Sequence, residues 1–111
     1  MENVSRDEFL KMVELNQIEV VQYLVDNEVK YSHAVLISAQ YGNLAMVRLL
    51  VEYGMKYDGA VYWAAANGNL DMVRYLVENG MWDDEAVWIA DDAGHKHVVD
   101  YLRTMEKAKF G

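Results

Sequence analysis

The residues of this chain that are best suited to chemistry lie together near its C-terminal end, in the segment Asp91-Asp92-Ala93-Gly94-His95-Lys96-His97. Two carboxylates and two imidazoles in one segment could ligate a divalent cation or serve as general acid and base. The spacing argues against both roles, because two histidines separated by one residue do not share a helix face as residues four apart do. We therefore favour a structural role for this segment and expect no metal site.

Other catalytic patterns are missing from the sequence. The chain has no cysteine, which removes thiol nucleophiles and thiolate metal ligands. Its glycines form no Gly-x-Gly-x-x-Gly or phosphate-binding loop, and no serine lies in a nucleophile elbow. We expect that the protein is not an enzyme, that it has no catalytic residue and that it binds no cofactor.

A repeat with a period of 26 residues, seen in the spacing of Gly42, Gly68 and Gly94, organises the chain that carries these groups. The segments 34–55 and 60–81 are identical at half or so of their positions. Four repeats tile the sequence without a linker, at residues 5–31, 32–57, 58–83 and 84–110.

Each repeat contains two predicted helices. In the third repeat they cover Gly59–Asn67 and Leu70–Asn79, whose apolar residues recur on one helical face. Gly68 and Gly80 follow these helices, and glycine readily takes the left-handed conformation that ends a helix. Asn69 is expected to cap the second helix.

The first helix of each repeat is also expected to begin at a capping residue. Ser5-Arg6-Asp7-Glu8 has the pattern of a capping box, in which the serine and glutamate side chains each bond the other's backbone N–H. Ser32, Asp58 and Asp84 stand where the first helices of the later repeats should start, and we expect them to act as N-caps.

Small residues on the first helix, such as Ala60, Ala64 and Ala65, allow a neighbouring helix to approach closely. A helical hairpin cannot bury its apolar face alone, so the repeats must stack. We predict an all-α fold, a short α-solenoid of four stacked helix-turn-helix repeats that forms one domain over residues 1–111. The first and last repeats should act as caps, and Asp91, which replaces the equivalent alanine, suits a polar outer face.

The segment Ala64–Gly80, which reads Ala-Ala-Ala-Asn-Gly-Asn-Leu-Asp-Met-Val-Arg-Tyr-Leu-Val-Glu-Asn-Gly, resembles the second half of the ankyrin repeat. Gly42, Gly68 and Gly94 match the glycine that ends the first helix of that repeat, and Leu44 and Leu70 match the leucine that follows it. The resemblance extends over nearly the whole chain. It implies a right-handed α-solenoid and a non-catalytic scaffold for protein–protein interaction.

Two departures from the ankyrin pattern concern the opening of the repeat. The usual Thr-Pro-Leu-His is replaced by Gly59-Ala60-Val61-Tyr62, and the repeat is about seven residues shorter than the ~33 typical of the family. We therefore expect β-hairpin fingers that are reduced or absent. In length the repeats resemble the abbreviated ankyrin-type repeats found in giant viruses and amoebae, or an engineered variant of them.

Aromatic residues are the most informative surplus, with eight Tyr and three Trp against two Phe. Their repeat positions suggest that many of them are structural. We expect packing between repeats for the residues of one second-helix position, Tyr23, Tyr75 and Tyr101. We expect burial between helices for the residues of two first-helix positions, Tyr62, Trp63 and Trp88.

A second aromatic set is expected at the surface and could bind a partner or cover the helix ends. Tyr31, Tyr57 and Trp82 fall in the loops between repeats, and Tyr41 lies at the end of a first helix. Tyr and Trp are enriched at interface hot spots. The candidate partner-binding residues are these aromatics and their polar or small neighbours: Tyr31, Gln40, Tyr41, Tyr57, Ala66, Asn67, Trp82 and Asp92.

Charge and hydropathy limit the partners. A net charge of −8, with scattered Lys and Arg, disfavours nucleic acid and anionic membranes. No apolar stretch approaches the ~18–20 residues that cross a bilayer, and the acidic start is unlike a signal peptide, so we expect a cytoplasmic protein. We expect another protein as partner and a monomer or weak homo-oligomer. The alternative is a structural or engineered repeat protein that self-associates with no external ligand.

Overall fold

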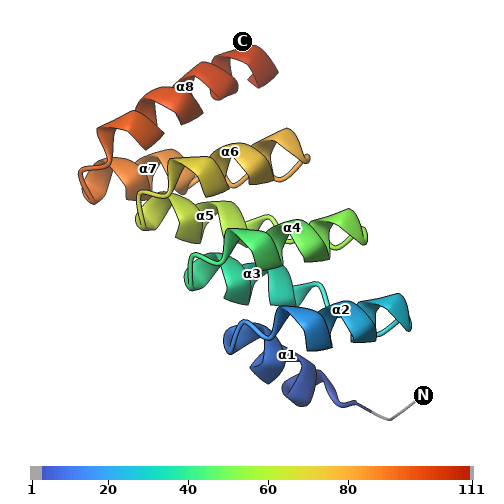
Figure 1. Cartoon of the computed structure of the whole chain (residues 1–111). Coiled ribbons are helices and arrows are strands. Elements are labelled where there is room, and N and C mark those ends of the chain that lie inside the picture. Colours follow the sequence, from blue (N-terminus) through green and yellow to red (C-terminus); the bar gives the residue numbers. More distant parts are fainter. Residues whose placement is uncertain (1–3, 111) are drawn as a thin grey trace. The chain divides into compact units, whose positions relative to one another are not determined.

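The computed structural model describes residues 4–110, and the regular structure within them is entirely α-helical. The helices are α1 (Arg6–Glu14), α2 (Ile18–Asp26), α3 (His33–Gln40), α4 (Leu44–Glu52), α5 (Gly59–Ala66), α6 (Leu70–Glu78), α7 (Ala86–Asp92) and α8 (Lys96–Phe110). Each predicted repeat contributes one consecutive pair of helices (Figure 1). The predicted all-α helix-turn-helix repeats are thus confirmed, and the described residues contain no strand that could form a β-hairpin finger.

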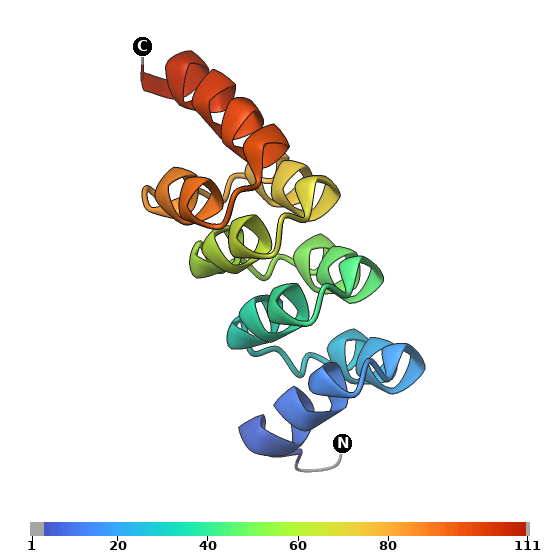
Figure 2. The ribbon, with the colours of Figure 1, turned by 90° about the vertical axis from the view of Figure 1, so that its left-hand side faces the viewer.

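The chain divides into two compact parts, residues 1–57 and 58–111, called here the N-terminal part and the C-terminal part. The boundary coincides with the predicted start of the third repeat. Within each part the first helices pack on each other, as do the second helices, and every first helix packs on the second helix of its own repeat. Figure 2 shows the resulting pair of layers, with α1 and α3 beside α2 and α4 in the N-terminal part.

Two of the predicted helix caps are present. Ser5 N–H donates to Glu8 Oε1 at 2.9 Å, and Glu8 N–H donates to Ser5 Oγ at 3.1 Å, which completes the capping box of α1. Asn69 caps α6, because its Oδ1 accepts a hydrogen bond from Met72 N–H at 3.2 Å. These bonds satisfy backbone donors that have no partner inside the helix.

The predicted side-chain caps at Ser32, Asp58 and Asp84 are wrong. Ser32 and Asp58 do precede α3 and α5, but neither side chain makes a capping bond, and α7 begins after Glu85 instead of Asp84. The Asp58 carboxylate accepts from the backbone N–H of Trp82 at 3.3 Å.

The physical reason lies in the backbone ahead of these helices, which is already helical at Ser32 and Asp58. Val35 N–H donates to Ser32 O, and Val61 N–H donates to Asp58 O, each at 3.0 Å. This tight turn occupies the N–H groups that a side-chain cap would otherwise satisfy.

The buried core is built from equivalent residues of successive repeats. One alanine near the start of each of α3, α5 and α7 is fully buried, namely Ala34, Ala60 and Ala86, and so is Leu76 of the second helix α6. In the C-terminal part, the alanine-lined side of α5 is therefore the side on which α6 and α7 pack. None of the helices in the described residues is long and apolar enough to cross a membrane.

Left-handed residues end the first helices, as predicted. Gly68 has φ +70° and Gly94 has φ +81°, and Asn16 takes the same place in the first repeat with φ 55°. The two glycines differ in their surroundings. A Cβ at Gly68 would lie 2.5 Å from Nδ1 of His95, whereas a Cβ at Gly94 would have no neighbour within 4 Å.

Replacing Leu76 by alanine should lower the free energy of unfolding by about 2–5 kcal/mol, because a fully buried leucine leaves a cavity when it is truncated. Urea unfolding followed by circular dichroism measures this loss. The control is Leu15→Ala, whose side chain is 56% exposed and whose removal should cost about 0.5 kcal/mol or less. Equal losses in the two variants would contradict the burial assigned to Leu76.

Gly68→Ala should destabilise the chain more than Gly94→Ala. Both substitutions place a Cβ on a left-handed residue, which costs about 1–2 kcal/mol, but only the first also displaces the His95 ring. Thermal unfolding of the two variants measures the difference. Adding His95→Ala to Gly68→Ala removes the clash and should bring its melting temperature closer to that of Gly94→Ala. If the difference in melting temperature stays the same, the His95 ring is not its cause.

Candidate functional site

Every first helix leaves one of its faces uncovered. In α3 the residues Ala34, Val35, Ser38 and Ala39 are buried, while others one to four positions apart remain partly or largely exposed. Residues at i, i+1 and i+4 lie on one side of a helix. We call the equivalent residues the open face: Leu10, Lys11 and Glu14 in α1; Leu36, Ile37 and Gln40 in α3; Tyr62, Trp63 and Ala66 in α5; and Trp88, Ile89 and Asp92 in α7.

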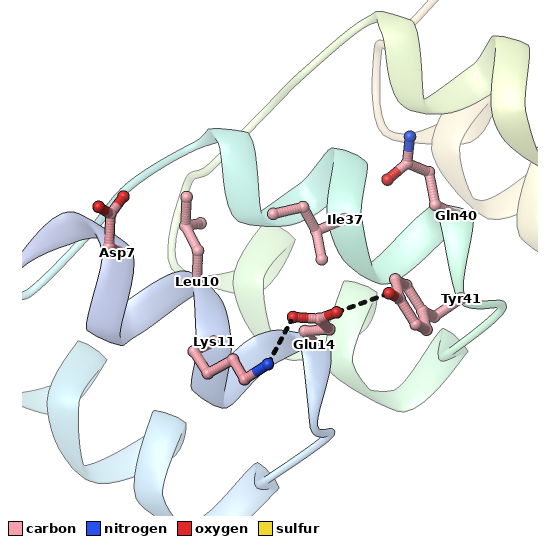
Figure 3. Close-up of a pocket in the computed structure, with 7 residues that line it drawn as sticks. All are labelled: Asp7, Leu10, Lys11, Glu14, Ile37, Gln40 and Tyr41. Atoms are coloured by element: carbon pink, nitrogen blue, oxygen red, sulfur yellow. Dashed lines mark hydrogen bonds and ion pairs between the residues drawn. The ribbon is translucent and has the colours of Figure 1, made fainter.

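In the N-terminal part the open face contains a cleft of ≈ 290 Å³ between α1 and α3 (Figure 3). Leu10 and Ile37 supply its apolar lining. The polar lining consists of Asp7, Lys11, Glu14, Gln40 and Tyr41. The cleft thus combines a small apolar surface with groups of both charges.

Tyr41 is anchored at the end of this cleft by Glu14. The Tyr41 hydroxyl donates to Glu14 Oε2 at 2.7 Å, and Lys11 Nζ lies 3.6 Å from Glu14 Oε1. The hydrogen bond from Tyr41, followed by the charge of Lys11, lowers the pKa of Glu14 below its usual value. The same hydrogen bond raises the pKa of Tyr41. A ring that is 56% exposed is therefore held in place by a residue of the preceding repeat.

In the C-terminal part the open face is aromatic. Trp63 is 40% exposed and Trp88 is 61% exposed, so the prediction that these indoles are buried between helices is wrong. Tyr62, predicted to be buried with them, is half-buried and meets the Trp63 ring edge-on at 5.6 Å. Alanines occupy the buried sides of α5 and α7, so the two helices pack through small side chains. The space left between them is too small for an indole, and the large rings lie outside.

The prediction that one second-helix position packs between repeats holds for Tyr101 and fails for Tyr23. Arg74, on the preceding repeat, places its guanidinium 5.3 Å from the centre of the Tyr101 ring, and burial raises the pKa of Tyr101. Tyr23 is 54% exposed. No Arg or Lys of the described residues lies over the Tyr23 ring as Arg74 lies over that of Tyr101.

The loop aromatics are half-buried, each against its own part of the chain. Tyr31 packs on the buried Phe9 with ring centres 5.5 Å apart, and Tyr57 meets His33 edge-on at 5.2 Å. Trp82 donates from Nε1 to Asp84 at 3.0 Å, and its ring lies 5.7 Å from Lys109 Nζ. Such contacts are expected of rings that cover helix ends. Their role in partner binding remains a prediction.

The other predicted partner-binding residues belong to the open face or adjoin it. Gln40, Ala66 and Asp92 occupy one register position on α3, α5 and α7, and Tyr41 and Asn67 follow α3 and α5 as their C-cap residues. Ala66 is half-buried and the rest are exposed. Sequence reasoning found this end of the face but missed Trp63 and Trp88. The sequence feature that could have revealed their exposure is the set of alanines beside them. Because alanines fill the packed side of each helix, the bulky side chains must lie on the side that faces solvent.

The two histidines of the C-terminal segment contact backbone of the third repeat. His95 Nε2 lies 3.1 Å from Ala66 O, and His97 Nε2 lies 3.2 Å from Gly68 O. These carbonyls belong to the last residue of α5 and to the turn that follows it, where backbone carbonyls lack partners inside the helix. Within residues 4–110 no group of three or more His, Asp or Glu side chains could hold a metal ion. The contacts of the two histidines with these carbonyls therefore support a structural role for this segment.

Comparison with known families identifies ankyrin repeats in this chain. The family model described as ankyrin repeats (3 copies) matches residues 9–83 and matches again over residues 36–110. Together the two matches cover nearly all of the chain. No curated protein matches it.

Tyr41→Phe should raise the pKa of Glu14 toward the usual value of a glutamate, because the largest cause of its lowering is removed. NMR titration of the side-chain carboxyl carbons measures the Glu14 pKa in the unmodified chain and in the variant. Glu8 is the control, since its pKa is lowered by hydrogen bonds with Ser5 and should stay the same. Any stability that the Tyr41 hydrogen bond adds is fully present when the pH is above the usual pKa of a glutamate. It is lost as the pH falls through the lowered pKa of Glu14 in the folded chain. An unchanged Glu14 pKa would contradict the hydrogen bond.

Proposed function

The chain belongs to the ankyrin repeat family, and we propose that it is a non-catalytic scaffold that binds another protein through the open face of its first helices. Ankyrin repeats are in general modules for protein–protein interaction. The finer proposal concerns which residues of this chain do the binding. It includes Tyr41 and the open-face residues of each part.

The observation that carries the proposal is the exposure of large aromatic side chains on the first helices α5 and α7 and at the C-cap of α3. Tyr41, Trp63 and Trp88 are 56%, 40% and 61% exposed. Tyr and Trp dominate binding hot spots because they contribute large contact areas and lose little conformational entropy. Helices that pack through buried alanines hold the rings of α5 and α7 in fixed positions, and Glu14 does the same for Tyr41.

The titration behaviour of the cleft supports binding over catalysis. A general acid or base works best when its pKa lies near the working pH. The pKa of Glu14 is lowered and the pKa of Tyr41 is raised, so each moves away from neutrality. A cleft of ≈ 290 Å³ also has room for only one or two side chains of a partner.

Affinity capture from a cell extract, with quantitative mass spectrometry, tests the proposal. The open-face variant carries Tyr41→Ala, Trp63→Ala and Trp88→Ala, and circular dichroism verifies that it is folded. Proteins retained by the unmodified chain should fall about tenfold or more with this variant, as expected when hot-spot residues are removed. Equal retention by both proteins would refute the proposal.

Two further measurements locate the surface. A variant with Tyr57→Ala and Trp82→Ala keeps the open face unchanged. If it retains as little of the captured proteins as the open-face variant does, the binding surface also includes the predicted loop residues. Light-scattering mass of the purified chain examines the alternative of self-association. An oligomer that the open-face variant abolishes, without any captured protein, would favour a self-associating structural protein.

A further inference from the structure

Helix α7 presents an indole between two carboxylates. Glu85, Trp88 and Asp92 are spaced three and four residues apart, which places them along one side of the helix. All three are exposed, and Trp88 is the most exposed large apolar side chain in the described residues. This stripe lies opposite the buried alanines Ala86 and Ala90, so it faces away from the core.

The carboxylates of the stripe, Glu85 and Asp92, are not engaged in ion pairs within the described residues. The sequence between Arg74 and Lys96 contains no Lys or Arg. An approaching cation would therefore meet two carboxylates whose charge is not neutralised by an ion pair.

A second indole lies on the adjacent helix. Trp63 is exposed on the open face of α5, which packs side by side with α7 (Figure 2). Packed helices lie about 8–10 Å apart. An extended chain in the polyproline II conformation advances about 9 Å in three residues and returns every third side chain to the same face. A segment that crosses both helices would thus place every third side chain over an indole.

We propose that the open face of the C-terminal part binds an extended partner segment that carries arginine side chains. The planar guanidinium stacks on an indole face and bonds a carboxylate in a fork, so one arginine uses both kinds of group in the stripe. Lysine offers a point charge without the stacking and binds more weakly. This inference rests on the proposed function and names the chemical class of the partner.

The test uses the intact chain and four capped synthetic peptides of the same length, each built from one triplet, Gly-Arg-Ser, Gly-Lys-Ser, Gly-Gln-Ser or Gly-Glu-Ser. The readout is the indole Nε1–H resonances of Trp63, Trp82 and Trp88 in a nitrogen–proton correlation spectrum, assigned with single Trp→Phe variants. Trp82 serves as an internal reference, since its Nε1 is bonded to Asp84 outside the open face.

The Gly-Arg-Ser peptide should shift the Trp63 and Trp88 resonances in a saturable way and bind more tightly than the Gly-Lys-Ser peptide. Equal shifts with the Gly-Gln-Ser or Gly-Glu-Ser peptide would overturn the inference. So would a response of Trp82 alone, because the peptide would then bind elsewhere.

Matched charge variants separate the stripe from the net charge of −8. Glu85→Gln with Asp92→Asn should weaken the Gly-Arg-Ser peptide about fivefold or more, since two close charge contacts are lost. Asp71→Asn with Asp100→Asn makes the same charge change on α6 and α8 and should alter the affinity by about twofold or less. Equal weakening by both pairs would overturn the inference. The capture experiment uses no peptide, so the proposed function can hold even when this inference fails.

Discussion

The close approach of the first helices through buried alanines is the constraint on which the rest of the molecule depends. Ala60, Ala64 and Ala65 are fully buried on α5, and Ala86 and Ala90 are fully buried on α7. Close-packed interiors leave no room for an extra ring between such helices. The large side chains of the same helices must lie on the opposite side. The packing that stabilises the repeats therefore also generates the exposed aromatic face.

The helix ends explain why the most reactive residue types of the chain serve packing. The left-handed Gly68 ends α5 and leaves a hollow that the His95 ring fills, because any Cβ there would meet that ring. His95 and His97 then bond carbonyls at the end of α5. Both imidazoles are thereby tied to the backbone of the preceding repeat. They thus join the third and fourth repeats.

The features predictable from the sequence are those set by local chemistry. The helix pairs, the left-handed Gly68 and the capping box at Ser5 depend on residues within one turn, so the periodicity reveals them. The exposure of Trp63 and Trp88 depends on the space left by residues of a neighbouring helix. The repeat positions of the two residues, on which the prediction of burial rested, do not reveal that space. The Asp58 side chain also has a non-local partner, since its carboxylate accepts from the backbone N–H of Trp82, 24 positions away.

The candidate site follows the same division between local and non-local causes. Tyr41 and Asn67 were found because they end helices, and the end of a helix is legible in the sequence. The bond from Tyr41 to Glu14 joins residues 27 positions apart and fixes the ring from outside its own helix. Side chains held in this way lose less entropy on binding than side chains on mobile loops. The described repeats lack a β-hairpin finger, so under the proposed function the helices themselves would supply the surface that a partner recognises.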